Sequence, residues 1–204
     1  MRRIGIMGGS FNPVHIGHLM LSEWARSEAG LDEVWLIPAG MPYMKASGQL
    51  LPGRERLHMT ELAIAENTGL RCLDIEISRA GDTYSYETLE QLNRDYPECE
   101  FFFILGADCL FAMENWRHPE RLFASCTVIA ASRGDIPMDR LQEKRVDLEH
   151  RYGGKIELLP FLNLSISSTI IRERIRKGFS VRYMVPDKVL EYMEEKGFYR
   201  EKEK

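Results

Sequence analysis

The sequence predicts an α/β fold: a Rossmann-like, doubly wound parallel sheet of about six strands with a C-terminal helical segment. Short apolar runs alternate along the chain with longer segments in which apolar residues recur at helical spacing. The runs are apolar at successive positions, which is typical of strands that helices cover on both faces of a parallel sheet. The 204 residues fit one domain, 1–204, whose helical C-terminal part begins near residue 166.

Glycine and proline bound the elements of the first half. The first strand ends at a glycine pair, the next strand at Pro38, and the helix between them at Gly30. A stretch rich in glycine and proline then predicts a mobile loop. The strands are expected at 3–7, 33–37 and 70–77, the helices around Trp24 and at 54–67 and 86–96, and the loop at 39–53.

The second half alternates in the same way. Three consecutive phenylalanines make 101–105 the plainest buried strand, Gly178 ends one helix, and Pro186 begins the last. The expected strands are 101–105, 127–131 and 155–159, and the expected helices are 119–125, 137–151, 167–177 and one that starts near Pro186 with Val189, Tyr192 and Met193 on one face.

Composition excludes several classes of protein. The net charge of −4 lacks the basic surplus of a nucleic-acid-binding protein, so a small phosphorylated ligand is favoured over DNA or RNA. No apolar run is long enough to span a bilayer, and no signal peptide is evident. The four cysteines form no metal-ligand pattern and are expected to be small buried residues. We expect a cytoplasmic protein with no membrane partner, and a homo-oligomer is left open.

The first motif lies between the first strand and the first helix. Gly8 and Gly9 leave the backbone open to phosphate, and the HisXGlyHis stretch that follows holds His15, Gly17 and His18. The two histidines are spaced i, i+3 at a helix start, so they can face the same ligand. The helix N-terminus adds backbone N–H groups and a partial positive charge. The motif therefore predicts a phosphate site that is neither a P-loop nor a GxGxxG fingerprint.

The second motif opens the helix after the last strand. It reads Ile-Ser-Ser-Thr-Ile-Ile-Arg, in which Ser167 or Ser168 is a natural N-cap. Together with Thr169, the serines offer hydroxyl groups beside free N–H groups. Arg172 stands one turn further on, with a guanidinium fork that suits phosphate. This motif predicts a second anion site.

These motifs resemble those of the nucleotidyltransferase superfamily that carries HxGH and a downstream ISSTxxR. Within it, the chain is most similar to the bacterial nicotinate-nucleotide adenylyltransferases. The resemblance covers nearly the whole chain and includes Gly-Ala-Asp at 106–108, Trp116 and the closing Val-Pro-Asp-Lys-Val at 185–189. Where the family commonly has Pro-Pro-His-Lys, this chain has Met44 before Lys45, and Ser10 and Asn12 stand where Thr and Asp are common.

The resemblance implies a reaction and its residues: adenylyl transfer from ATP, with Mg²⁺ carried by the ATP phosphates, to nicotinate mononucleotide in NAD biosynthesis. The implied catalytic residues are His15, His18, Lys45 and Arg172. ATP would be bound by Gly8, Gly9, Ser10, Phe11, Gly106, Asp108, Ser167, Ser168 and Thr169. The acceptor would be held by Thr83 and Tyr84, stacked on by Trp116 and approached by Arg133.

Other interpretations stay open at this point. Taken singly, Trp116 could be a core residue and Asp108 a helix cap. The same chemistry could act on nicotinamide mononucleotide, phosphopantetheine or a cytidylyltransferase substrate, because these share both phosphate motifs. A nucleotide-binding regulator could keep the fold without turnover. A dehydrogenase is disfavoured because its glycine fingerprint is missing.

Overall fold

The computed structural model describes residues 1–42, 50–132 and 136–200. Its main sheet has six parallel strands in the order β4-β2-β1-β6-β7-β8, and β3 and β5 form a separate two-stranded sheet. The strands are β1 Arg2–Gly9, β2 Glu33–Pro38, β3 Met41–Pro42, β4 Leu70–Cys72, β5 Asp82–Thr83, β6 Cys99–Gly106, β7 Thr127–Ser132 and β8 Lys155–Pro160. The predicted parallel α/β sheet of about six strands is confirmed.

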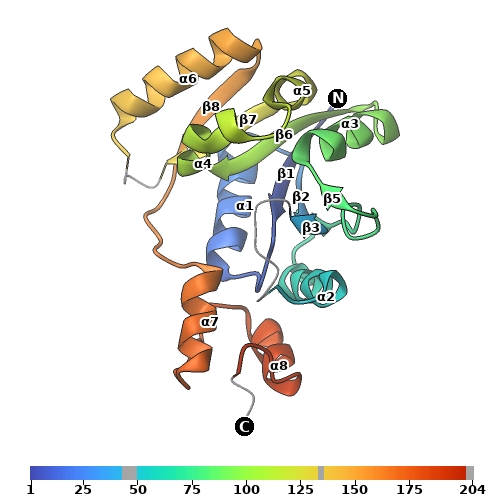
Figure 1. Ribbon diagram of the computed structural model, residues 1–204, viewed down its shortest axis with the longest axis vertical. Helices are drawn as coiled ribbons and strands as arrows, with labels where there is room; N and C mark the ends of the chain where they lie inside the picture. Colours follow the sequence, from blue (N-terminus) through green and yellow to red (C-terminus); the bar gives the residue numbers. More distant parts are fainter. Residues whose placement is uncertain (43–49, 133–135, 201–204) are drawn as a thin grey trace.

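Helices connect the strands on both faces of the sheet (Figure 1). They are α1 Ile16–Glu28, α2 Gly53–Ile64, α3 Ser85–Asp95, α4 Ala107–Ala112, α5 Pro119–Ser125, α6 Met138–Tyr152, α7 Ser168–Arg176 and α8 Asp187–Glu195, with a 3₁₀ turn at Met113–Asn115. None of the described helices is long and apolar enough to cross a membrane.

Successive residues of each strand belong to opposite cores. In β6, Phe102 and Ile104 pack in the layer that includes α1, α2, α7 and α8. Phe101, Phe103 and Leu105 of the same strand pack in the layer of α3, α4, α5 and α6. Because side chains alternate across a strand, an apolar run at every position fills both layers.

The strand order reverses next to β1. From β1 the chain winds outward through β2 and β4, and then crosses back to β6, on the other side of β1, before reaching β7 and β8. The carboxyl ends of β1 and β6 therefore border the switch point, where such sheets bind ligands. The first motif follows β1, and the Gly-Ala-Asp stretch follows β6.

One expectation needs correction, and two features of the fold were not predicted. The strand predicted at 70–77 ends at Cys72, because residues 75–78 form a turn closed by a bond from Ser78 N–H to the Asp74 carbonyl. The pairing of β3 with β5 had no counterpart in the predicted elements. Helix α4 was also missed, since it follows β6 without an intervening loop. All four cysteines are free; of the burial expected for them, Cys99 is fully buried, and Cys72, Cys109 and Cys126 are partly buried.

The C-terminal part lies at one end of the molecule. Figure 1 shows α7 and α8 at the lower end of the view with the C-terminus, opposite the end where the N-terminus lies. Val189 and Met193 of α8 are buried in one core layer, and Tyr192 packs against the same layer, so the three lie on one face as predicted.

Candidate active site

The first motif occupies the turn between β1 and α1. The backbone N–H of His15 donates to Nδ1 of His18 across 3.2 Å, and the two imidazole rings stack with centroids 3.6 Å apart. A Cβ at Gly17 would lie 3.2 Å from two atoms of the His15 ring, so glycine leaves the room that the ring needs. The motif thus brings both histidines together at a helix start, where the dipole favours an anion.

The ring of His18 is held on two sides. It stacks on His15, and its centroid lies 4.9 Å from that of Phe11 in an edge contact. Because Nδ1 accepts the bond from His15, the proton of the neutral ring resides on Nε2. A donor on a ring with fixed orientation suits an anionic oxygen.

The second motif docks onto the first. Ser167 is the N-cap of α7, and its hydroxyl accepts a bond from the N–H of Ile170 at 3.3 Å. Ser168 instead donates its hydroxyl to the carbonyl of Pro13 at 2.9 Å. Of the two serines that the sequence offered as N-cap, Ser167 therefore has that role, while Ser168 joins the motifs.

Arg172 makes the second link between the motifs. Its Nη1 donates to the carbonyl of Asn12 at 2.8 Å, and its Nη2 donates to Oγ1 of Thr169 at 3.2 Å. Its Nε is buried without a hydrogen-bond partner among the described residues. The guanidinium is thus aligned beside the first motif with a donor still to be used.

A buried arginine that sequence reasoning missed supports the carboxyl edge of β1 and β2. Arg56 is 1% exposed and donates to the carbonyls of Ser10 at 2.8 Å, Ala39 at 2.6 Å and Leu51 at 2.9 Å. Burial lowers the pKa of Arg56. One signal in the sequence could have indicated its burial: Arg56 lies three residues before Met59 in α2, so the two residues share the buried face of the helix.

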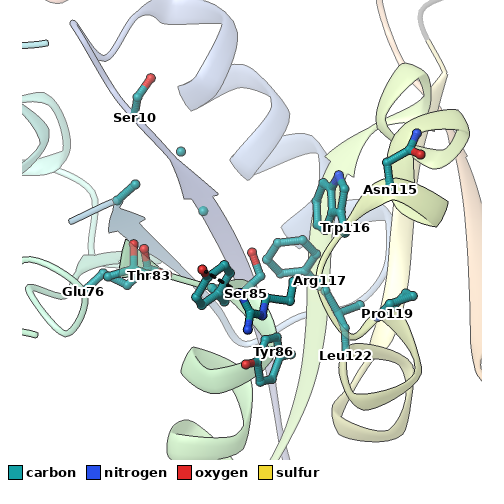
Figure 2. Close-up of a pocket in the computed structure, with 15 residues that line it drawn as sticks. Ser10, Glu76, Thr83, Ser85, Tyr86, Asn115, Trp116, Arg117, Pro119 and Leu122 are labelled. Carbon is teal, nitrogen blue, oxygen red and sulfur yellow. Dashed lines mark hydrogen bonds between the residues drawn. The ribbon is translucent and has the colours of Figure 1, made fainter. Parts of the chain in front are cut away.

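A cavity of about 260 Å³ opens beside the first motif. In Figure 2, Thr83 and Glu76 lie on one side of the cavity, Trp116 lies on the other, and Ser10 of the first motif lies at the upper end of the view. Gly8 and Gly9 also line it. The structure therefore brings the predicted acceptor residues Thr83, Tyr84 and Trp116 to the same cavity as the first predicted ATP-binding residues.

The hydroxyl of Thr83 stands out in this cavity. Thr83 is 7% exposed, and its Oγ1 has no hydrogen-bond partner among the described residues. A buried hydroxyl without a partner is costly, and such groups are rare away from sites of function. It is therefore a position where a ligand atom can supply the missing bond.

Trp116 and Tyr84 form aromatic walls. Trp116 is partly exposed, and its ring meets Phe103 edge-on with centroids 6.2 Å apart. Arg117, which sequence reasoning missed, donates from Nη1 to the Tyr84 hydroxyl at 3.3 Å, and its guanidinium carbon lies 5.2 Å from the centre of that ring. Arg117 carries a positive charge at the cavity and forms no ion pair with any described residue.

The remaining predicted residues differ in placement. Gly106 ends β6 and is the N-cap of α4, so Asp108 is the second residue of the helix, within its first turn, and not its N-cap. A Cβ on Gly106 would lie 2.4 Å from Oδ1 of Asp108, which places that carboxylate against the strand end. Lys45 and Arg133 lie outside the described residues, as does Met44.

Comparisons with known proteins place the chain in a family. Residues 6–174 match the cytidylyltransferase-like family. The chain is 40% identical, over 98% of its length and 100% of the relative's, to a probable nicotinate-nucleotide adenylyltransferase of Lachnoclostridium phytofermentans. It is 38% identical to one of Dehalococcoides mccartyi, over 97% of each chain. The chain belongs to the nicotinate-nucleotide adenylyltransferases.

Solved structures agree with this family in fold. Nicotinic acid mononucleotide adenylyltransferase of Plasmodium falciparum, complexed with NaAD, superposes with a TM-score of 0.81, covers 98% of each chain and is 22% identical. The same enzyme complexed with APC gives a TM-score of 0.78. The nicotinate-nucleotide adenylyltransferase fold is thus shared from end to end of the chain.

Proposed function

We propose that this protein transfers the adenylyl group of ATP to nicotinate mononucleotide, giving nicotinate adenine dinucleotide and pyrophosphate in NAD biosynthesis. One observation carries the proposal: Ser168 and Arg172 both donate to backbone carbonyls of residues 12–13, beside His15 and His18. Two anion-binding motifs from opposite ends of the chain thereby form one surface. The name shared by full-length relatives supports the acceptor.

The phosphate side binds the triphosphate of ATP. The phosphates accept hydrogen bonds from His15, His18 and Arg172, and positive charge on these side chains attracts them. The turn after β1 binds ATP through Gly8, Gly9, Ser10 and Phe11. The start of α7 binds it through Ser167, Ser168 and Thr169. The adenosine is contacted by Gly106 and Asp108. Lys45, outside the described residues, is proposed to approach the same phosphates.

The acceptor side binds nicotinate mononucleotide in the 260 Å³ cavity. The pyridine ring stacks on Trp116, and Thr83 and Tyr84 supply hydroxyl and backbone contacts. The cavity is mostly walled by carbon, with a few polar groups that fix orientation, as is usual for small-molecule sites. Arg133, outside the described residues, is proposed to lie close to the nucleotide.

Catalysis proceeds by in-line attack. A phosphate oxygen of nicotinate mononucleotide attacks the α-phosphorus of ATP, a new P–O bond forms, and the bond to the pyrophosphate leaving group breaks with its electron pair. A phosphate monoester has a second pKa near 6, so the nucleophile is already mostly ionised at pH 7 and needs no general base. The protein contributes positioning and stabilisation of charge on the equatorial and leaving oxygens.

We propose that Mg²⁺ enters this site bound to the phosphates of ATP. Among the residues that the structure describes, no group of three His, Cys, Asp or Glu side chains lies together so as to hold a metal ion. Mg²⁺ readily binds through substrate phosphates and water with few protein ligands, and it neutralises charge on the phosphates. His15, His18 and Arg172 then have only the remaining charge to offset.

The test is pyrophosphate release from ATP and Mg²⁺ with nicotinate mononucleotide, nicotinamide mononucleotide and phosphopantetheine measured in parallel. We expect release with nicotinate mononucleotide well above the other two. Release with another acceptor alone would overturn the assignment of Thr83, Tyr84 and Trp116. ATP binding without release for every acceptor would instead identify a nucleotide-binding regulator. Cytoplasmic location and any homo-oligomer remain predictions.

A further inference from the structure

The chain reverses direction after α8. The N–H of Phe198 bonds to the carbonyl of Met193 at 3.0 Å, and Gly197 has the left-handed φ of 65° that commonly ends a helix. Tyr199 follows with a φ of 63°, a conformation that residues other than glycine rarely adopt. A rare backbone conformation persists where surrounding contacts fix it.

Tyr199 reaches back to the first motif. Its hydroxyl donates to Oδ1 of Asn12 at 2.8 Å, although the two residues are 187 positions apart. Asn12 is 4% exposed, and the same Oδ1 accepts the backbone N–H of Leu51 at 3.2 Å. The backbone carbonyl of Asn12 accepts the bond from Arg172 described above. Three distant segments thus meet at one residue of the turn between β1 and α1.

The phenol of Tyr199 is suited to act as a donor. It lies near the guanidinium groups of Arg172 and Arg56, both of which favour its ionised form. Burial is the larger effect and raises the pKa of Tyr199 well above its usual range. The hydroxyl therefore keeps its proton at neutral pH and can donate to the amide oxygen of Asn12 without adding charge beside the two arginines.

We propose that Tyr199 is a positioning residue for ATP: it fixes the side chain of Asn12 and, through the carbonyl of the same residue, the guanidinium of Arg172. The proposal rests on the proposed function in that Arg172 meets the triphosphate. Misplacement of a binding group by about 1 Å can cost on the order of 100-fold in rate, so a hydroxyl that touches no substrate can still affect turnover. Asn12 is the intermediary.

The test compares Tyr199→Phe with Tyr192→Phe. Each change deletes one phenolic hydroxyl from the C-terminal part and keeps the ring. Tyr192 donates its hydroxyl to the carboxylate of Glu55 on α2 and not to Asn12. We expect Tyr199→Phe to lower kcat or raise the KM for ATP by about tenfold, the usual scale for one well-placed bond, with the KM for nicotinate mononucleotide unchanged.

Tyr192→Phe is expected to keep kcat and both KM values within about twofold of wild type, even where its melting temperature falls as much as that of Tyr199→Phe. Equal ATP kinetics for the two variants, once corrected for the folded fraction, would overturn the proposal. So would an equal rise in both KM values for Tyr199→Phe, because that pattern reports a general loosening of the protein rather than misplacement of Arg172.

A second measurement does not depend on turnover. The affinity for α,β-methylene ATP is measured for wild type, Tyr199→Phe, Asn12→Ala and the double variant. We expect Tyr199→Phe to weaken binding in the native background and to add nothing when Asn12 is alanine, because the bond is already lost. Additive losses would overturn the proposal. Where Asn12→Ala fails to fold, Arg172→Lys supplies the second background. Failure of the proposed function alone would leave this coupling intact.

Discussion

The two sides of the site are built in different ways. On the phosphate side, Ser168, Arg172 and Tyr199 all bond to Asn12 or Pro13, so segments from distant parts of the chain hold one turn. On the acceptor side, the cavity has aromatic walls, and the hydroxyl of Thr83 is buried without a partner. In the function that we propose, the charged end of the substrate meets a preorganised frame, while the acceptor supplies contacts that the protein alone leaves unmade.

The largest effect should come from the phosphate side. His18→Ala should lower kcat by about 100- to 1,000-fold, the usual loss when one preorganised donor is removed. His18 also accepts a bond from the backbone N–H of His15, so alanine should cost stability as well, about 1 kcal/mol. His18→Asn keeps an acceptor near that N–H. It should lose as much activity as His18→Ala but less stability.

Steady-state rates and melting temperatures of these variants separate the two roles. His150→Ala is the matched control, because His150 is exposed on α6 and should leave both unchanged. A folded His18→Ala protein with the kcat of wild type would remove His18 from the catalytic set.

Arg172→Lys should lower kcat/KM for ATP by about 10- to 100-fold. Lysine keeps the charge but cannot bond to Asn12, Thr169 and a phosphate at once, and a hydrogen bond to a charged group is worth about 1.5–3 kcal/mol. Arg174→Lys, on the same helix, should change kcat/KM little, since Arg174 bonds to the Ser180 carbonyl instead. Equal values for the two variants would argue against phosphate contact by Arg172.

The acceptor side should respond more weakly and in another parameter. Trp116→Ala should raise the KM for nicotinate mononucleotide about tenfold, because a stacked aromatic pair is worth about 0.5–1.5 kcal/mol beyond the area it buries. Affinity for ATP should stay as it was. Trp116→Phe keeps an aromatic face and should recover most of the loss. A matching rise in the KM for ATP would show that the two sides are not separate.

The smallest effect should be Thr83→Val. Replacing a buried hydroxyl that lacks a partner removes an unsatisfied group, so the free protein should become more stable by about 1 kcal/mol, which raises the melting temperature by about 2–4 °C. The KM for the acceptor should rise a few-fold. Thr88→Val should instead destabilise, because the Thr88 hydroxyl bonds to the buried Glu76 carboxylate at 2.9 Å. Destabilisation by both would mean that Thr83 already has a partner.

Local signals in the sequence predicted most of the sheet and both phosphate motifs. Alternation of apolar runs with helical periodicity located the six main strands, and the HisXGlyHis spacing predicted a histidine pair that the structure stacks at 3.6 Å. The strand at 70–77 was predicted too long because Leu73 and Ile75 alternate as in a strand, while in the structure they pack on the core from a turn. Periodicity alone does not distinguish these cases.

What the sequence could not reveal are contacts between segments far apart. Nothing local indicates that Arg56 binds carbonyls at the ends of two strands, or that Tyr199 bonds to Asn12. Arg117 follows Trp116 directly, yet its position over the Tyr84 ring depends on how α3 and α5 pack. Such contacts carry no spacing rule, because the fold and not the chain order makes the partners neighbours.

The bond between Tyr199 and Asn12 also has a consequence for the timing of biosynthesis. At about 5–20 residues per second, a ribosome needs roughly 10–40 s to pass from the first of these residues to the second. Contacts with such a sequence separation form late, after loop closure over most of the chain. A nascent chain can therefore pair its early strands long before all the bonds to its first motif have formed. The bond from Tyr199 to Asn12 forms only after residue 199 has been translated.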